Sequence, residues 1–240
     1  MNSLIKRRKH EESLMITNFS SVTAEALQKL QTNIQFAGLD TPIKVIGITS
    51  SVESEGKSTL TANLANTYAF RGAKVLIINL DLRRPTIHHF YDVPNKIGIT
   101  DYVASNDITA EQLVVHLKNG VDLINAGTRT PYSTKVLASK KIPELIEKLK
   151  PDYDYILVDT APVLLVADAM ICSHYIDGFL VVCTQGYTKK KELANCINSM
   201  KNNNVNIIGV VMTEVKDFSQ VGSGKEAYHY YYGTGSKSKK

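Results

Sequence analysis

The chain has 240 residues, of which 43% are hydrophobic and 21% charged, values typical of a globular protein with room for one large α/β domain or two small ones. No apolar run approaches the ~20 residues that cross a bilayer, and no apolar segment follows the basic residues at 6–9 as it would in a secretory signal, so we expect a cytoplasmic protein. Seven positive charges lie at 6–9 and 237–240, which leaves about −2 of the +5 net charge for the remainder, and no nucleic-acid partner is expected.

Three cysteines, Cys172, Cys183 and Cys196, are widely separated and lack metal-ligand spacing. An odd count without an export signal argues against a disulfide framework. We therefore expect three small buried hydrophobic side chains.

The first secondary-structure elements are predicted from apolar spacing. Residues 1–20 are polar and without period, which predicts a flexible basic arm. Apolar residues then recur at helical spacing over 21–36, with Ser21 or Thr23 as the N-cap. Pro42 marks the break before a first strand over 44–49.

A polar segment with the features of a phosphate-binding loop follows this strand and opens a helix. Gly56 allows close approach of the backbone to a phosphate, Lys57 can reach the β- and γ-phosphates, and Ser58 can offer its hydroxyl to Mg²⁺. The general pattern G-x-x-x-x-G-K-[ST] would place glycine at 51, where this chain has serine. The alternative is an ordinary strand-to-helix turn. The residues expected to bind nucleotide are Ser50, Ser51, Glu55, Gly56, Lys57, Ser58 and Thr59.

Strands and helices alternate along the rest of the chain, which predicts an α/β fold with a doubly wound, mostly parallel sheet flanked by helices, like that of P-loop NTPases. The predicted domain spans 21–215. Further strands are expected at 74–80, 121–125, 154–159, 178–184 and 205–212. Helices are expected at 58–71, where Gly72 ends the helix, and at 131–138, 142–149 and 189–202, with loops and short helices over 86–120.

Two of these strands end in a carboxylate, at the edge of a parallel sheet where ligands bind. Asp159 fits a Walker B aspartate that holds the Mg²⁺ shell, with a capping or turn aspartate as the alternative. Asp81 can orient Mg²⁺-bound water or accept a proton, with an ion pair to Arg83 or Arg84 as the alternative.

We accordingly expect Lys57, Asp81 and Asp159 to be the catalytic residues and Ser58, Asp81 and Asp159 to hold the metal. Arg129, after Gly127 and Thr128, is a further candidate near the site from its place along the chain alone.

The last segment, 216–240, is dominated by Gly, Ser, Tyr and Lys, which predicts a disordered tail. Four of the twelve tyrosines lie within five residues there, at Tyr228, Tyr230, Tyr231 and Tyr232. Aromatic side chains in such a tail have no core to fill, so they are candidates for modification. A sticky low-complexity tail is the alternative.

Four motifs in order resemble those of the bacterial tyrosine kinases of capsular and exopolysaccharide synthesis, of the cytoplasmic P-loop type. Residues 50–59 resemble the family's Walker A, S-x-x-P-G-E-G-K-S-T, and 76–83 its Walker A′, an apolar run followed by D-x-D-x-R. Residues 153–162 resemble its Walker B, and 228–232 its autophosphorylated tyrosine cluster. The resemblance spans about residues 20–240.

The resemblance implies an ATP- and Mg²⁺-dependent protein-tyrosine kinase that phosphorylates its own tail and regulates polysaccharide polymerisation or export. It implies a position at the inner face of the cell membrane through a separate transmembrane activator, a tyrosine phosphatase as a second partner, and a homo-oligomer.

This chain departs from the family pattern at three places. Asn79 replaces the first aspartate of Walker A′, Glu53-Ser54 replaces Pro-Gly in the loop, and the ring-assembly motif E-x-x-R-x-x-R has Gln28 and Gln31 for its arginines. Because asparagine cannot accept a proton, a nucleotide-binding adaptor with weak or no kinase activity is an alternative function. A related partition-type ATPase is another, although that group typically carries lysine where this chain has Val52.

Overall fold

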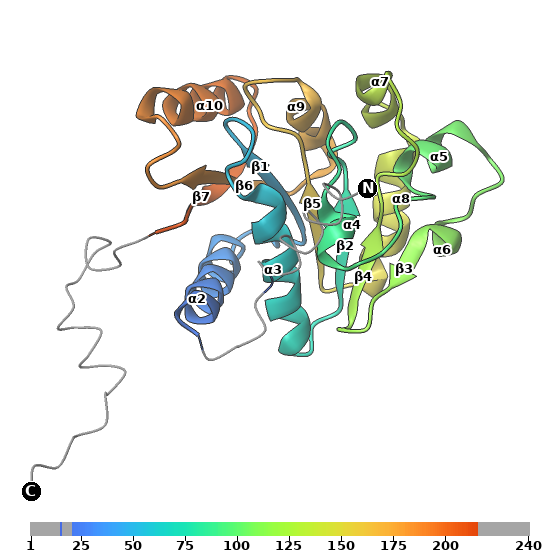
Figure 1. Ribbon diagram of the computed structural model, residues 1–240, viewed down its shortest axis with the longest axis horizontal. Coiled ribbons are helices and arrows are strands. Elements are labelled where there is room, and N and C mark those ends of the chain that lie inside the picture. Colours follow the sequence, from blue (N-terminus) through green and yellow to red (C-terminus); the bar gives the residue numbers. More distant parts are fainter. Residues whose placement is uncertain (1–14, 16–20, 216–240) are drawn as a thin grey trace, which may run out of the picture.

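The computed structural model describes Met15 and residues 21–215, and these residues form a seven-stranded sheet covered by helices on both faces (Figure 1). The predicted tail with its four tyrosines, and all of the predicted arm except Met15, lie outside the described residues. The strand order is β3-β4-β2-β5-β1-β6-β7, with β3 antiparallel to β4 and all other neighbours parallel. The strands are β1 (Val45–Ser50), β2 (Val75–Asn79), β3 (Val114–His116), β4 (Val121–Ile124), β5 (Tyr155–Asp159), β6 (Gly178–Thr184) and β7 (Ile207–Thr213).

The helices divide between the two faces of the sheet. Side chains of α2, α3 and α4 join one apolar cluster, and those of α5 to α10 join the other. None of the helices among the described residues combines the length and apolar character needed to cross a bilayer. The helices are α2 (Val22–Ala37), α3 (Lys57–Phe70), α4 (Ile87–Phe90), α5 (Ile99–Ala104), α6 (Ala110–Leu113), α7 (Ser133–Leu137), α8 (Lys141–Leu149), α9 (Asp168–Cys172) and α10 (Lys190–Asn202), with 3₁₀ turns η1 (Lys150–Asp152) and η2 (Ser173–Tyr175).

The near-continuous apolar runs of the central strands are explained by burial on both faces. In β2, Val75 and Ile77 belong to the cluster beneath α3, whereas Leu76 and Ile78 belong to the cluster on the opposite face. Successive side chains of a strand point to opposite faces, so a parallel strand covered on both sides has no polar position in its interior.

The predicted parallel sheet is confirmed, and the predicted strands and helices are found within about two residues of their expected ends. Ser21 is the N-cap of α2, where its Oγ accepts a hydrogen bond of 3.2 Å from the Ala24 amide. Gly72 follows α3 with φ +86°, as expected of a residue that ends a helix. All three cysteines are buried free thiols.

Two elements escaped prediction. Strand β3 has only three residues, none of them buried, and exists because it pairs with β4 at the sheet edge. Helix α9 has five residues, too few to show helical periodicity in a sequence.

The strand order brings together segments that are distant in sequence. Strand β5 lies between β1 and β2, and all three run parallel. The loop after β1, the segment after β2 and Asp159 at the end of β5 therefore meet at one edge of the sheet, where open α/β sheets bind ligands.

Helix α2 buries one of the two glutamines that stand where the family has arginine. Gln31 is only 2% exposed, and its Oε1 accepts a hydrogen bond of 3.3 Å from Arg71 at the end of α3. This side chain contributes to packing within the chain, between α2 and α3.

We expect Gly47→Ala to lower the free energy of unfolding by about 1–3 kcal/mol, because core overpacking costs that much. A Cβ at Gly47 in β1 would lie 2.4 Å from Cε1 of Phe179, a buried ring on the neighbouring β6. Urea denaturation measures the effect. The matched control is Gly209→Ala in β7, where an added Cβ meets no atom within 4 Å. Equal losses in the two variants would contradict the role of the Phe179 contact.

Candidate functional site

The loop between β1 and α3 is held by hydrogen bonds within the loop and by residues at the ends of the neighbouring strands β6 and β7. Ser50 Oγ donates to the Val52 carbonyl at 2.7 Å, and the buried carboxylate of Glu55 accepts from the Val52 amide at 2.9 Å. Thr188 Oγ1 donates to the other oxygen of the same carboxylate, and Thr213 Oγ1 donates to the Glu55 carbonyl at 3.1 Å. Glu55, expected to bind nucleotide, thus has its carboxylate engaged in shaping the loop.

Two residues of the loop have left-handed backbone conformations. Ser54 has φ +62° and Gly56 has φ +84°. Ser54 therefore adopts the conformation for which the family pattern has glycine, at an energetic cost for a residue with a Cβ. Gly56 is the N-cap of α3 and provides no side-chain cap, so the amides of the first turn face the loop and form a site for an anion.

Four predicted site residues form one buried cluster. Lys57 Nζ lies 2.7 Å from Oδ2 of Asp81 and 3.4 Å from Oδ1 of Asp159. Ser58 Oγ donates to Oδ2 of Asp159 at 2.7 Å. All four residues are at most 9% exposed. The cluster joins the loop after β1 to the ends of β2 and β5, as the sequence predicted.

Burial and charge act in opposite directions on these groups. Burial raises the pKa of Asp159 to about 6, although Lys57 opposes the rise. Burial also raises the pKa of Asp81, but the Lys57 ammonium and the backbone amides of Arg84 and Arg83 outweigh it and hold that pKa below its usual range. Burial lowers the pKa of Lys57, and the two carboxylates more than compensate, so it is raised. Asp81 is therefore the carboxylate that stays ionised, whereas Asp159 titrates closer to neutral pH.

Asn79 lies beside the cluster with an unused donor. It pairs in register with Asp159 on the neighbouring strand, and its Oδ1 accepts from the Asp81 amide at 3.2 Å. Its Nδ2 is buried and has no hydrogen-bond partner among the described residues. A buried unpartnered amide is costly, so this one is suited to donate to a bound group.

The two arginines after Asp81 have partners of their own. Arg84 forms an ion pair with Glu53 of the loop. Arg83 binds the buried carboxylate of Asp168 in a bidentate pair, with Nε 2.7 Å from Oδ2 and Nη2 3.1 Å from Oδ1. Neither guanidinium is paired with Asp81. The alternative interpretation of that aspartate, an ion pair with Arg83 or Arg84, is therefore not found in the structure.

Three residues important for this geometry carry no sequence signal. Asp168 starts a five-residue helix, and Thr188 and Thr213 are ordinary threonines more than 130 residues from the loop that they brace.

The structure also places the two remaining residues predicted to bind nucleotide. Ser51 is buried in the loop, and Thr59 is half-buried in the first turn of α3, where its carbonyl accepts from Asn63.

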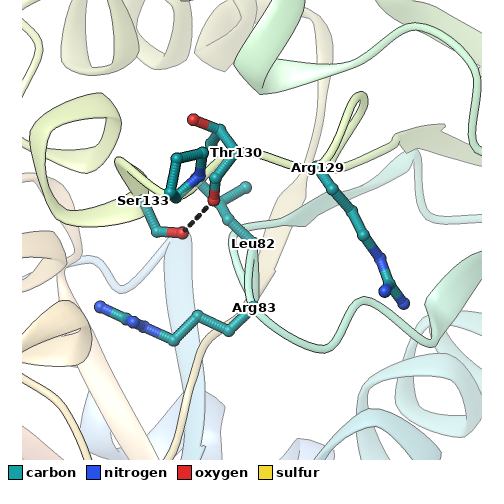
Figure 2. Close-up of a pocket in the computed structure, with 6 residues that line it drawn as sticks. Leu82, Arg83, Arg129, Thr130 and Ser133 are labelled. Carbon is teal, nitrogen blue, oxygen red and sulfur yellow. Dashed lines mark hydrogen bonds between the residues drawn. The ribbon is translucent and has the colours of Figure 1, made fainter.

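A pocket of about 340 Å³ lies next to the Asp81 segment (Figure 2). We call it the arginine pocket, and its lining residues are Leu82, Arg83, Arg129, Thr130, Pro131 and Ser133. Arg129, which the sequence placed near the site only from its position along the chain, lines this pocket beside Leu82 and Arg83.

The donor set of the buried cluster fits a hard divalent cation. Two carboxylates and a serine hydroxyl are oxygen ligands, and Mg²⁺ is commonly bound by one or two carboxylates together with substrate phosphates. Among the described residues, no group of three or more His, Cys, Asp or Glu side chains is placed to hold a metal ion.

Comparison with known sequences finds relatives over nearly the whole chain. The AAA domain family matches residues 43–210. Tyrosine-protein kinase YwqD of Bacillus subtilis (strain 168) is 32% identical over 227 residues, 95% of this chain and 93% of that relative. Tyrosine-protein kinase CpsD of Streptococcus agalactiae serotype III (strain NEM316) is 32% identical over 200 residues, 81% of this chain and 84% of that relative.

Solved structures show the same fold. The kinase domain of Escherichia coli tyrosine kinase ETK has a TM-score of 0.78 at 28% identity, covering 84% of this chain and 81% of that chain. The chimerical protein CapA2B2 has a TM-score of 0.80 at 28% identity, covering 84% and 88%. The septum site-determining protein MinD of Pyrococcus horikoshii OT3, complexed with Mg-ADP, has a TM-score of 0.60 at 25% identity, covering 70% and 69%.

We expect Lys57→Met to lower the free energy of unfolding at pH 7.5 by about 3–5 kcal/mol, because two buried carboxylates lose their cation. Lys57 opposes the rise in the pKa of Asp159, so its removal lets that pKa climb above about 6. In the unfolded chain the pKa of this carboxyl is 3.8, so the folded variant binds more protons than the unfolded one. Its stability therefore increases as the pH falls towards 5, and the deficit shrinks. Urea denaturation between pH 5 and 8 measures it.

The matched control for this change is Lys118→Met, at an exposed lysine in the turn between β3 and β4. We expect little loss at any pH, since exposed charges contribute little. A Lys57→Met deficit that stays constant from pH 5 to 8 would contradict the coupling between Lys57 and the two carboxylates.

Proposed function

We propose, because the chain belongs to the bacterial tyrosine-protein kinase family, that it transfers the γ-phosphoryl group of ATP to protein tyrosines, including those of its own tail. Through this activity it regulates the polymerisation or export of capsular or exopolysaccharide. The observation that carries the proposal is the buried cluster of Lys57, Ser58, Asp81 and Asp159 beside a braced phosphate-binding loop.

Each residue of the cluster has a role in nucleotide binding. Lys57 binds β- and γ-phosphate oxygens, and the free amides at the start of α3 add donors to the same phosphates. Ser58 and Asp159 would hold Mg²⁺, with Asp81 beside them. Bound Mg²⁺ supplies positive charge next to the phosphoryl oxygens. The buried Nδ2 of Asn79 is available as one more donor to a bound oxygen.

Asp81 is the proton acceptor in the transfer. The tyrosine Oη attacks the γ-phosphorus, the bond between that phosphorus and the β,γ-bridging oxygen of ATP breaks, and the phenolic proton passes to an oxygen of Asp81. The phosphate oxygens of the nucleotide compete with Asp81 for Lys57 Nζ, now 2.7 Å away. As Lys57 turns to the phosphates, one of the influences that hold down the pKa of Asp81 weakens.

The proposal includes the partners and place that the family resemblance implies. These are a separate transmembrane activator that brings the chain to the inner face of the cell membrane, and a tyrosine phosphatase that reverses the modification. A homo-oligomer belongs to it too, but its contacts must differ from arginine pairing through α2, because Gln31 is buried against α3 and Gln28 carries no charge.

A second candidate function rests on Asn79. In a nucleotide-binding adaptor with weak or no kinase activity, the amide would complete a binding site that lacks one carboxylate for catalysis. The buried Nδ2 suits binding as well as it suits transfer, so this candidate needs its own experiment.

We expect the purified chain, given ATP, Mg²⁺ and the cytoplasmic segment of its activator, to form phosphotyrosine in its tail, measured by mass spectrometry. Asp81→Asn should lower the rate by about 10²–10⁴-fold, the usual contribution of a general base, while nucleotide still binds. Asp40→Asn, at an exposed aspartate, is the charge-matched control. If the wild-type chain binds ATP but forms no phosphotyrosine with or without the activator segment, the kinase proposal is wrong.

Asn79→Asp separates the two candidates. For an active kinase we expect the rate to change by less than about threefold, because phosphoryl transfer depends mainly on positioning and charge stabilisation, which the other residues supply. Radiolabel incorporation from ATP measures the rate. A gain of tenfold or more would instead favour the adaptor, in which asparagine has removed the activity.

A further inference from the structure

The arginine pocket has a composition suited to an aromatic side chain that carries a negative group. Leu82 and Pro131 give it apolar surface, and Thr130 and Ser133 give it polar groups. Its volume of about 340 Å³ lies within the range of pockets that hold small ligands, ~300–1,000 Å³. Figure 2 shows Leu82 between the two arginines, whose guanidinium groups extend to different sides of the pocket.

The two arginines differ in their charge balance. Arg83 is paired with the buried carboxylate of Asp168, and its Nη2 also donates to Thr134 at 3.1 Å. Arg129 is exposed and forms no hydrogen bond or ion pair with any other described residue. Its long stem can turn the guanidinium towards a bound anion, which it recognises through a fork of donors.

The pocket lies at a defined chain distance from the proposed proton acceptor. Leu82 and Arg83, which line the pocket, follow Asp81 by one and two residues. Their Cα atoms therefore lie within about 7 Å of the Cα atom of Asp81. In an extended peptide, side chains two residues apart project to the same side at a spacing of about 6.6 Å. A peptide that presents a tyrosine to Asp81 can therefore place the residue two positions away in the pocket.

The tail sequence repeats this spacing. One acidic residue and three tyrosines follow one another at intervals of two residues: Glu226, Tyr228, Tyr230 and Tyr232. Tyr231 does not belong to this series. Glu226 is the one acidic residue among the ten positions before Tyr228.

We propose that the arginine pocket binds an anionic side chain two residues before the tyrosine being phosphorylated. The carboxylate of Glu226 fills it when Tyr228 reacts, and the phosphate of each new phosphotyrosine fills it for the next step, so that modification runs from Tyr228 to Tyr230 to Tyr232. The order of modification rests on the proposed kinase function, whereas anion binding by Arg129 does not.

The test uses peptides of residues 222–234 that carry Tyr231→Phe and Tyr232→Phe, so that Tyr230 is one defined acceptor. One peptide has phosphotyrosine at 228 and the other Tyr228→Phe. We expect the wild-type chain to phosphorylate Tyr230 about tenfold faster in the phosphorylated peptide, the factor expected for one charge-assisted contact. For Arg129→Gln the ratio of the two rates should fall to about one, and for Lys118→Gln, at an exposed lysine in the β3–β4 turn, it should stay at the wild-type value.

A second pair of peptides distinguishes the carboxylate from the phosphate as the source of the anion. With Tyr228 as the one acceptor, Glu226→Gln should slow its phosphorylation several-fold in the wild-type chain and have no effect in Arg129→Gln. Arg129→Lys, which keeps the charge but loses the fork of donors, should give ratios between those of the wild type and Arg129→Gln.

Binding without ATP separates this inference from the kinase proposal. Fluorescence anisotropy of the labelled 228-phosphopeptide should show affinity about tenfold weaker for Arg129→Gln than for the wild type and for Lys118→Gln. Equal affinity in all three proteins, or equal rates on both acceptor peptides, would overturn the pocket and leave the kinase proposal standing. Binding that depends on Arg129, with no peptide ever phosphorylated, would support the pocket and overturn the kinase proposal.

Discussion

The ammonium group of Lys57, held between the carboxylates of Asp81 and Asp159, is the interaction on which the rest of the site depends. Three buried charges from three separate segments are tolerable only because they compensate one another at 2.7 and 3.4 Å. The strand order makes this possible, since β5 lies between β1 and β2 and brings Asp159 between the other two segments. The same arrangement leaves the cation available to phosphates, because ligands approach at this edge of the sheet.

The loop that presents Lys57 is held in shape by groups at the carboxyl ends of the adjacent parallel strands β6 and β7. The carboxylate and carbonyl of Glu55 accept hydrogen bonds from Thr188 and Thr213, which lie after β6 and at the end of β7. These bonds help to hold Ser54 in a left-handed conformation that an L-residue seldom adopts. Loop geometry is thus set before nucleotide arrives, and little conformational entropy remains to be lost on binding.

Most of the fold could be predicted from the sequence, because parallel strands such as β2 are apolar at every position and end at a polar residue. Lys57, Asp81 and Asp159 could be predicted as partners because each follows or ends a strand of one parallel sheet. The roles of Thr188 and Asp168 could not, since their contacts depend on how distant loops pack and neither residue belongs to a motif. The engagement of the Glu55 carboxylate within the loop was unpredictable for the same reason.

The pair of Arg83 with Asp168 has a consequence for the catalytic carboxylates themselves. Asp81 is joined through two residues of chain to Arg83, and Asp168 is joined through the segment after β5 to Asp159. With Lys57 between the carboxylates, these links form a closed ring: two stretches of backbone fastened at both ends by ion pairs. A ring of this kind has no loose end, so the ion pair of Arg83 with Asp168 is a second link between the two stretches of backbone that carry the proton acceptor and the metal-binding carboxylate.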